Sequence, residues 1–403
     1  MSVRAAPLCA FAVNGGVYGS LLPRFPEIAD RVGASEAAFG AVLFAAALGG
    51  LCGSLVAPLA VRAADEVVAT VAVGSAFVLL AVGVAWAPEL LALGAAFLVL
   101  GVFDGAHDVT MNALAVQVQQ RLRRPIMGQM HAVWSISLTA AGILGAAAAA
   151  LRVPVDVHIG TVAALAIAAQ LAMFVGWRNI GGVSPADGGA DAQPTSVRRP
   201  RERPQLRVLL AVLGVAAFAA SYVESPGQEW TGLLLSRGFD AGAGLSAAAP
   251  VVFSAGLVAS RLALDALLLR WSAGAVAASA GGMIALSMVA GLMIVMVGGS
   301  AWWALAAVGG AGLGAGVVFP LLFGGADYLS TRYGIAPAAT ASIISALSRV
   351  GAISAPVVVG SLTGLIGLSM VFVVMGLGGL LVLLALPRAA AGSSGRTASR
   401  RSP

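Results

Sequence analysis

The sequence predicts an all-α integral membrane protein with twelve transmembrane helices in two pseudo-symmetric six-helix bundles. Three observations support this prediction: the composition, the number of long apolar segments, and a polar stretch near the middle. Of the 403 residues, 59% are hydrophobic and only 10% are charged. A soluble domain carries about 25% charged residues. Since so few charges could not cover a water-facing surface, we expect the chain to lie in a lipid bilayer.

Twelve apolar segments are long enough to cross a bilayer, which takes about 20 residues. The first six are expected at residues 8–24, 38–60, 67–86, 90–117, 126–150 and 156–177. The second six are expected at residues 207–235, 244–268, 274–297, 301–328, 336–362 and 367–387.

A polar stretch rich in Gly, Pro, Asp and Arg separates the two sets, "RNIGGVSPADGGADAQPTSVRRPRERPQLR". It has no apolar period, which predicts a solvated linker. The expected domains are an N-terminal bundle at 1–177, a linker at 178–206, a C-terminal bundle at 207–387 and a disordered tail at 388–403. Two similar halves joined by a long polar loop are typical of a duplicated transporter architecture.

The arginines predict the orientation in the membrane. All 23 basic residues are Arg, and an even number of spans places both termini on one side. Most of the arginines fall on the side of the termini and linker, and the opposite side holds only Arg24, Arg31, Arg152 and Arg237. Cytoplasmic loops carry the excess of positive charge. We therefore expect both termini in the cytoplasm, and the Ala- and Arg-rich composition suggests a bacterial inner membrane.

The fourth segment contains the stretch "GVFDGAHDVTMNALAV", which is unusually polar for a membrane span. Asp104, Asp108 and Asn112 recur every four residues and share one stripe of a helix, and His107 flanks that stripe. A charged group at the bilayer centre costs about 2.5–3.5 kcal/mol. The stripe therefore predicts functional groups that face a wet cavity. The alternative is that Asp104 and His107 only form hydrogen bonds to backbone or to a second helix.

Other segments also place polar side chains at membrane depth. They are Asn14 and Tyr18 in the first, His131 and Trp134 in the fifth, and Glu224, Gln228 and Trp230 in the seventh. The two tryptophans could equally be anchors at the membrane surface. The third, sixth, ninth and twelfth segments carry almost no embedded charge and are expected to face lipid as supports. Loss of the Gln170 side chain in the sixth should therefore weaken solute binding much less than loss of His131 or Asn112.

The run "DVTMNALAVQVQQRLRRPIMGQMHAVWS" resembles a bacterial branch of the major facilitator superfamily that is related to the fucose permease group. "NGGVYGSLLPRFPEI", "VESPGQEWTGLLL" and "GLGAGVVFPLLF" agree with it. The resemblance implies a central cavity and alternating access. The fucose permease has a protonatable acid in an E-x-x-x-N pattern, which Asp108 and Asn112 match with Asp in place of Glu. Its acid in the first helix is replaced here by Asn14.

The stretch "SRLALDALLLRW" retains part of a loop motif of that superfamily, with Arg261, Asp265 and Arg270. The resemblance implies an ion pair among these residues that could latch the cytoplasmic gate, although a merely structural pair fits equally well. The corresponding loop in the first half, "APLAVRAADEVV", keeps almost none of the motif.

These features predict a secondary active transporter that is proton-coupled and moves a small polar, sugar-like solute. Asp108 is the expected main proton site, followed by Glu224 and Asp104. The expected solute contacts are Asn14, Tyr18, Asn112, His131, Trp134, Gln228 and Trp230. An exporter of drugs or metabolites driven by proton antiport is the alternative. A non-transporting receptor of the same fold would leave the acid stripe unexplained.

An enzyme is not expected. His107, His131 and His158 lie on different segments without metal-binding spacing. The sequence has no Gly-rich loop ending in G-K-[ST], which argues against ATP hydrolysis. We expect no cofactor and no metal. The expected partners are the solute, protons and the lipid bilayer, with no nucleic acid, and the expected state is a monomer.

Overall fold

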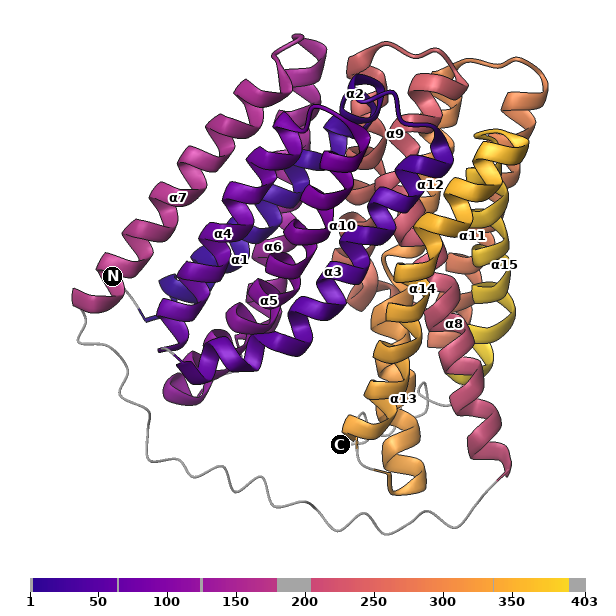
Figure 1. Cartoon of the computed structure of the whole chain (residues 1–403). Helices are drawn as coiled ribbons and strands as arrows, with labels where there is room; N and C mark the ends of the chain where they lie inside the picture. Colours follow the sequence, from indigo (N-terminus) through magenta and orange to yellow (C-terminus); the bar gives the residue numbers. More distant parts are fainter. Residues whose placement is uncertain (1–2, 64, 124–125, 180–203, 336, 391–403) are drawn as a thin grey trace. The chain divides into compact units, whose positions relative to one another are not determined.

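The computed structural model describes residues 3–63, 65–123, 126–179, 204–335 and 337–390 (Figure 1). All regular structure in these residues is helical. Most of the predicted linker at 178–206 and of the predicted tail at 388–403 lies outside the described residues, so these two assignments stay predictions.

The first half of the chain forms six spans, of which the first is built from three consecutive elements. α1 (Ala5–Leu21) runs through the short 3-10 turn η1 (Leu22–Arg24) into α2 (Phe25–Arg31). The other five spans are α3 (Glu36–Ala63), α4 (Glu66–Trp86), α5 (Leu90–Leu122), α6 (Met127–Ala150) and α7 (Val155–Asn179).

The second half also forms six spans, of which the fourth is interrupted. Its first span, α8 (Pro204–Glu229), is followed by the short α9 (Thr231–Leu233) and the π-helical turn η2 (Leu234–Gly238). The interrupted span consists of α12 (Ala301–Ala315) and α13 (Val318–Tyr333). The others are α10 (Ala243–Arg270), α11 (Ala273–Met296), α14 (Pro337–Ile366) and α15 (Met370–Ala390).

The prediction of twelve membrane-spanning helices is confirmed: 12 helices are long and apolar enough to cross a membrane. Several boundaries differ from the prediction by a few residues, and two of them illustrate the reason. The first span continues to Arg31 because α2 extends it, and the seventh ends at Glu229 rather than at residue 235. Periodicity identifies the apolar run, but capping and local turns determine where a helix ends.

Packing groups the chain into two compact units. The first contains residues 1–186, 232–251 and 356–365, and the second contains 187–231, 252–355 and 366–403. The helices α10 and α14 are therefore divided, with one part of each helix in each unit. The two groups are called the first unit and the second unit.

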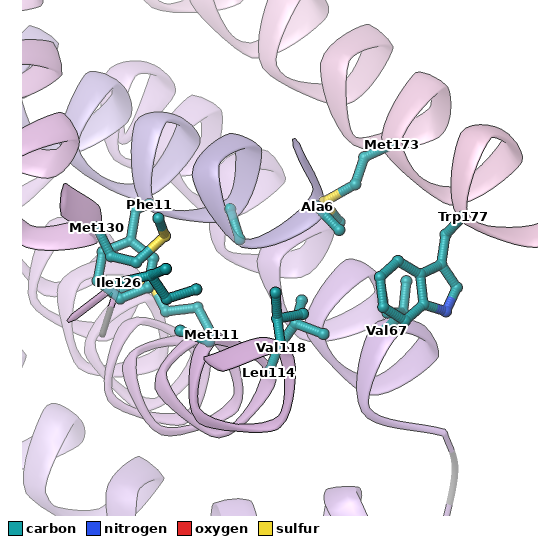
Figure 2. Packing of buried hydrophobic residues seen from close by; sticks show 12 residues of the cluster. Ala6, Phe11, Val67, Met111, Leu114, Val118, Ile126, Met130, Met173 and Trp177 are labelled. Carbon is teal, nitrogen blue, oxygen red and sulfur yellow. The ribbon is translucent and has the colours of Figure 1, made fainter. Parts of the chain in front are cut away.

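A core of aliphatic, aromatic and sulfur-containing side chains holds five helices of the first unit together, and Figure 2 shows these side chains converging. Its labelled members are Ala6, Phe11, Val67, Met111, Leu114, Val118, Ile126, Met130, Met173 and Trp177. Without a strong hydrophobic driving force between helices in lipid, association depends on close van der Waals packing. This core fixes α1, α4, α5, α6 and α7 around a group of polar residues.

Glycines bring helices into direct backbone contact in both units. In the first unit, a Cβ on Gly53 of α3 or on Gly105 of α5 would collide with backbone atoms of the other helix. In the second unit, a Cβ on Gly281 of α11 would collide with the backbone of Leu383 in α15. A Cβ on Gly379 of α15 would collide with the side chain of Ile284 and the backbone nitrogen of Ala285 in α11. Small residues at helix interfaces are typical of membrane bundles because they let the backbones approach.

Candidate functional site

Asn14 on α1 is the centre of a hydrogen-bonded network in the first unit. Its Oδ1 accepts a hydrogen bond from Nε1 of Trp134 on α6 at 2.7 Å, and its Nδ2 donates to Oδ1 of Asp104 on α5 at 2.8 Å. The Asn14 side chain is only 5% exposed. Both ends of its amide are thus used, and one side chain links three helices.

Close contact between α1 and α6 positions this network. A Cβ on Gly15 would collide with the backbone of Trp134, and a Cβ on Gly19 would collide with the backbone of Leu138. Both glycines lie within two helical turns of Asn14. They therefore set the distance between α1 and α6 at which the Trp134 indole reaches the Asn14 amide. A larger residue at either position would push α6 away from α1.

His107 lies beside this network inside the first unit. Its Nδ1 is 3.4 Å from Nδ2 of Asn14, and its ring faces Phe77 of α4 with 6.1 Å between the ring centroids. The side chain is completely buried. Asp104 and His107 thus both contact Asn14 of α1, and His107 also packs against α4. Whether these two residues are functional or only hold helices together stays a prediction.

Asp108 and Asn112 lie together on α5, as their spacing predicts. Nδ2 of Asn112 donates to Oδ1 of Asp108 at 3.1 Å and to the backbone oxygen of Asp108 at 2.8 Å. Asp108 is exposed, whereas Asp104 one turn earlier is partly buried and bonded to Asn14. Of the two acids, Asp104 is therefore the more buried, and Asp108, the main proton site expected from the family pattern, is the more exposed.

The predicted solute contacts in the first unit differ in exposure. His131 is exposed and packs edge-on against Phe11, with 5.5 Å between the ring centroids. Tyr18 and Trp134 are partly buried. Trp134 is more than a surface anchor, because its Nε1 is committed to Asn14. His131 keeps a free edge with which a ligand could form a hydrogen bond.

The second unit contains an acid of a different kind, Glu224 on α8. Its Oε1 accepts a hydrogen bond from Nη2 of Arg261 on α10 at 3.1 Å, and the two side chains are 21% and 32% exposed. Nε of Arg261 donates to the backbone oxygen of Gly316 at 3.1 Å. Gly316 lies at the break between α12 and α13, where the end of a helix leaves carbonyl groups without an intrahelical partner.

This ion pair corrects the expected partner of Arg261. The resemblance implied an ion pair among Arg261, Asp265 and Arg270, but the pair that forms joins Arg261 to Glu224. Asp265 and Arg270 are exposed and form no ion pair in the described part of the chain. Asp265 lies one turn beyond Arg261 on the same helix, whereas tertiary packing brings Glu224 of α8 within hydrogen-bond distance of Arg261.

The remaining predicted contacts lie near the end of α8. Gln228 is partly buried, but Trp230 is completely buried, so a ligand could not touch it without a rearrangement. Oγ of Ser225 donates to Oε2 of Glu229 at 2.8 Å. The hydroxyl groups of Tyr222 and Ser354 lie 2.9 Å apart and join α8 to α14.

Arg237 in η2 forms a cluster of ion pairs that the sequence did not predict. Its guanidinium donates to Oδ1 of Asp30 at 2.9 Å and 2.7 Å, to Oε1 of Glu36 at 3.0 Å and to the backbone oxygen of Ala34 at 3.0 Å. Burial lowers the pKa of Arg237, but the hydrogen bonds and charges of Asp30 and Glu36 outweigh it and raise the pKa overall. Arg237 therefore stays charged and holds the turn between α2 and α3.

A hollow of about 600 Å³ lies next to this cluster in the first unit. Its lining includes Asp30, Arg31, Arg152, Ser236 and Ser246. Arg31 also donates to the backbone oxygen of Ala85 at the end of α4. From the sequence, Arg31, Arg152 and Arg237 indicate only how the chain is oriented in the membrane. Their positions around this hollow depend on which turns come together in the fold.

Gln170 of α7 has a setting that its sequence position does not reveal. This side chain is completely buried in the first unit, close to His107 and Gly74. The expectation that its loss would weaken solute binding little stays a prediction. A lone Gln in an apolar span is itself a signal, because embedded polar groups are costly unless they are paired.

The chain resembles known transporters. No family model matches the sequence. The uncharacterized transporter y4wD of Sinorhizobium fredii is 26% identical over 387 residues, which cover 94% of this chain and 95% of that protein. The nucleoside transporter NupG matches with a TM-score of 0.68 and 12% identity, over 96% of this chain and 99% of that chain. A point mutant of NupG matches with a TM-score of 0.72 and 12% identity, over 96% and 100%.

The similarity to NupG shows the fold, because at this identity it carries nothing more. The all-α, twelve-helix fold of the major facilitator type predicted from the sequence is thereby confirmed. The relation to the fucose permease branch stays a prediction.

Proposed function

We propose that this protein is a proton-coupled secondary transporter that moves a small polar solute across the membrane by alternating access. Twelve membrane-crossing helices and the similarity to two transporters support transport rather than catalysis. The observation that carries proton coupling is the surroundings of Asp104: an acid inside a helix bundle whose partner is the neutral amide of Asn14.

Asp104 is the best candidate for the proton site. Among the described residues it forms no ion pair, and nearby Asp108 adds a second negative charge. Burial and a like charge both disfavour a charged carboxylate. A carboxyl group without a compensating cation can change its protonation state during a transport cycle. Asp108 and Glu224, also predicted from the sequence, are the next candidates.

We propose that the solute is recognised by the polar side chains of the predicted site that remain available. On α5 and α6 these are Asn112 and His131, and on α8 this is Gln228. Donors and acceptors of this kind suit hydroxylated molecules such as sugars and nucleosides. The curated relative is an uncharacterized transporter, and the structural relative is a nucleoside transporter. Nucleosides are therefore tested first and monosaccharides second.

Purified protein in liposomes tests this function. The liposomes enclose a pH-sensitive dye, and labelled nucleosides and monosaccharides are added one at a time without a pH gradient. A transported solute should enter together with protons and acidify the interior. Net uptake of a labelled solute without any change of pH would support transport but contradict proton coupling. Absence of uptake with every solute of both classes would contradict the proposed solute class.

We also propose that both termini face the cytoplasm of a bacterial cell, which the arginine distribution supports. Single cysteines are placed at two exposed positions, Asp156 at the start of α7 and Arg270 at the end of α10, in a chain without Cys9 and Cys52. An impermeant thiol reagent should label the cysteine at 156 in intact cells and not the one at 270. The opposite labelling would reverse the orientation.

A further inference from the structure

Three helices of the first unit meet where Gly74 of α4 has no side chain. A Cβ at this position would lie 2.6 Å from Nε2 of His107 on α5 and 2.6 Å from Oε1 of Gln170 on α7. Both polar side chains are completely buried. Neither of these atoms has a hydrogen-bond partner in the described structure, and Nε2 of Gln170 has none either.

The neighbouring hydrogen bonds decide which nitrogen of His107 carries the proton. Oδ1 of Asn14 accepts from the Trp134 indole, which can only donate, so the NH₂ group of Asn14 must face Asp104 and His107. A donor that faces Nδ1 of His107 requires Nδ1 to be an acceptor. In a neutral imidazole the hydrogen then resides on Nε2. His107 thus directs an N–H group toward Gly74 and Gln170.

His107 and Gln170 both border Gly74, yet neither Nε2 of His107 nor Oε1 of Gln170 has a hydrogen-bond partner in the described structure, so no direct bond joins them. Buried polar atoms without partners cost free energy. A water molecule can accept from Nε2 of His107 and donate to Oε1 of Gln170 at once. Buried waters typically form two to four such bonds in polar sites.

We infer that Gly74, His107 and Gln170 enclose a binding site for a buried water molecule that links α7 to the network around Asn14. Hydrogen bonds then run from Trp134 through Asn14 and His107 to Gln170, across four helices. Gly74 is required because any side chain there would occupy the space between the two polar groups. This inference does not depend on proton coupling or on the identity of the solute.

An experimental structure that resolves ordered waters is the direct test. We expect a density peak within hydrogen-bond distance of both His107 Nε2 and Gln170 Oε1. The peak should disappear in Gln170→Met, which has similar length but no acceptor. A direct bond between His107 and Gln170 without such a peak would overturn the inference.

The tautomer of His107 provides a second test by NMR of protein labelled with ¹⁵N-histidine. The sequence has three histidines, so the His107 signals can be assigned by their loss in His107→Phe, or by assigning His131 and His158 if that variant does not fold. We expect neutral His107 with its hydrogen on Nε2. A hydrogen on Nδ1 would contradict the proposed link, because Nδ2 of Asn14 could then not donate to His107 and the chain of hydrogen bonds would be broken there.

A pair of glycine variants on one helix tests the space itself. Gly74→Ala should lower the midpoint of thermal unfolding by several degrees and remove the density peak. Gly83→Ala is the matched control, because a Cβ at Gly83 meets no atom within 4 Å. It should leave the midpoint unchanged or raise it slightly. A Gly74→Ala protein that retains the peak would show that the glycine does not form the site.

Discussion

The two units of this molecule each hold an acid among their helices, and they compensate it in different ways. Asp104 of the first unit is bonded to the neutral amide of Asn14 at 2.8 Å. Glu224 of the second unit is bonded to the cationic Arg261 at 3.1 Å. Asn14 in turn accepts a hydrogen bond from Trp134, and Arg261 in turn donates one to the backbone oxygen of Gly316.

This difference separates two roles that embedded acids can have. An acid paired with an arginine is stable in its charged form, and the pair ties helices together. An acid bonded only to neutral groups has no such compensation, so its charge can change when a proton binds. We therefore propose proton exchange at Asp104 and structural support at Glu224, a division that substitutions at these residues and their partners can test.

The largest effect is expected from Asp104→Asn. The amide retains an oxygen that can accept the bond from Asn14, so the fold should survive, but it cannot exchange a proton. Accumulation of solute driven by a proton gradient should fall by more than about tenfold, which corresponds to about 1.4 kcal/mol. Counterflow should persist. Unchanged accumulation would transfer the coupling role to Asp108 or Glu224.

Arg261→Met should cause the largest loss of stability. It leaves Glu224 without its cation and should cost about 2 kcal/mol. This is less than the roughly 3–5 kcal/mol expected for a fully buried pair, because both side chains are partly exposed. Thermal unfolding of the purified protein measures the effect.

Two further variants sharpen this test. Arg270→Met on the same helix is the matched control, because Arg270 is exposed and forms no ion pair among the described residues. Adding Glu224→Gln to Arg261→Met should recover part of the lost stability, since no uncompensated charge then remains. Failure of that rescue would mean that Arg261 acts mainly through Gly316.

A smaller effect is expected from Trp134→Phe. Phenylalanine retains an aromatic ring but has no N–H group, so the hydrogen bond to Asn14 is lost, at a cost of about 1 kcal/mol. The Asn14 amide is then free to rotate, so proton-driven accumulation should weaken together with stability. Trp303→Phe is the control, because Trp303 is 67% exposed and lies in the second half of the chain. Equal effects of both variants would remove Trp134 from the network.

The smallest effect on stability is expected from Asp108→Asn, within about 0.5 kcal/mol, as for most exposed substitutions. Asp108 is exposed, and Asn at this position can still accept the bond from Asn112. Accumulation should fall less than in Asp104→Asn. A greater loss than in Asp104→Asn would show that the family pattern, and not burial, identifies the coupling acid.

Much of the fold could be predicted because a bilayer imposes a simple rule on sequence. Each span must be apolar over its whole length, so all twelve could be recognised from composition. The polar stripe on α5 was also evident, since Asp108 and Asn112 are neighbours on one helix and their contact depends only on its period. Contacts between different helices carry no such local signal, and this explains the choice of Asp108 over Asp104.

The sequence by itself therefore determined the fold class, the number of spans and the helices that carry polar groups. Only the tertiary structure decided the partners: Asn14 for Asp104, Arg261 for Glu224, and Arg237 for Asp30 and Glu36. It also brought Gln170 next to His107. The physical reason is that membrane insertion depends on the apolar content of each segment alone, whereas pairing depends on packing between helices far apart in sequence, where glycines such as Gly15 and Gly74 set the distances.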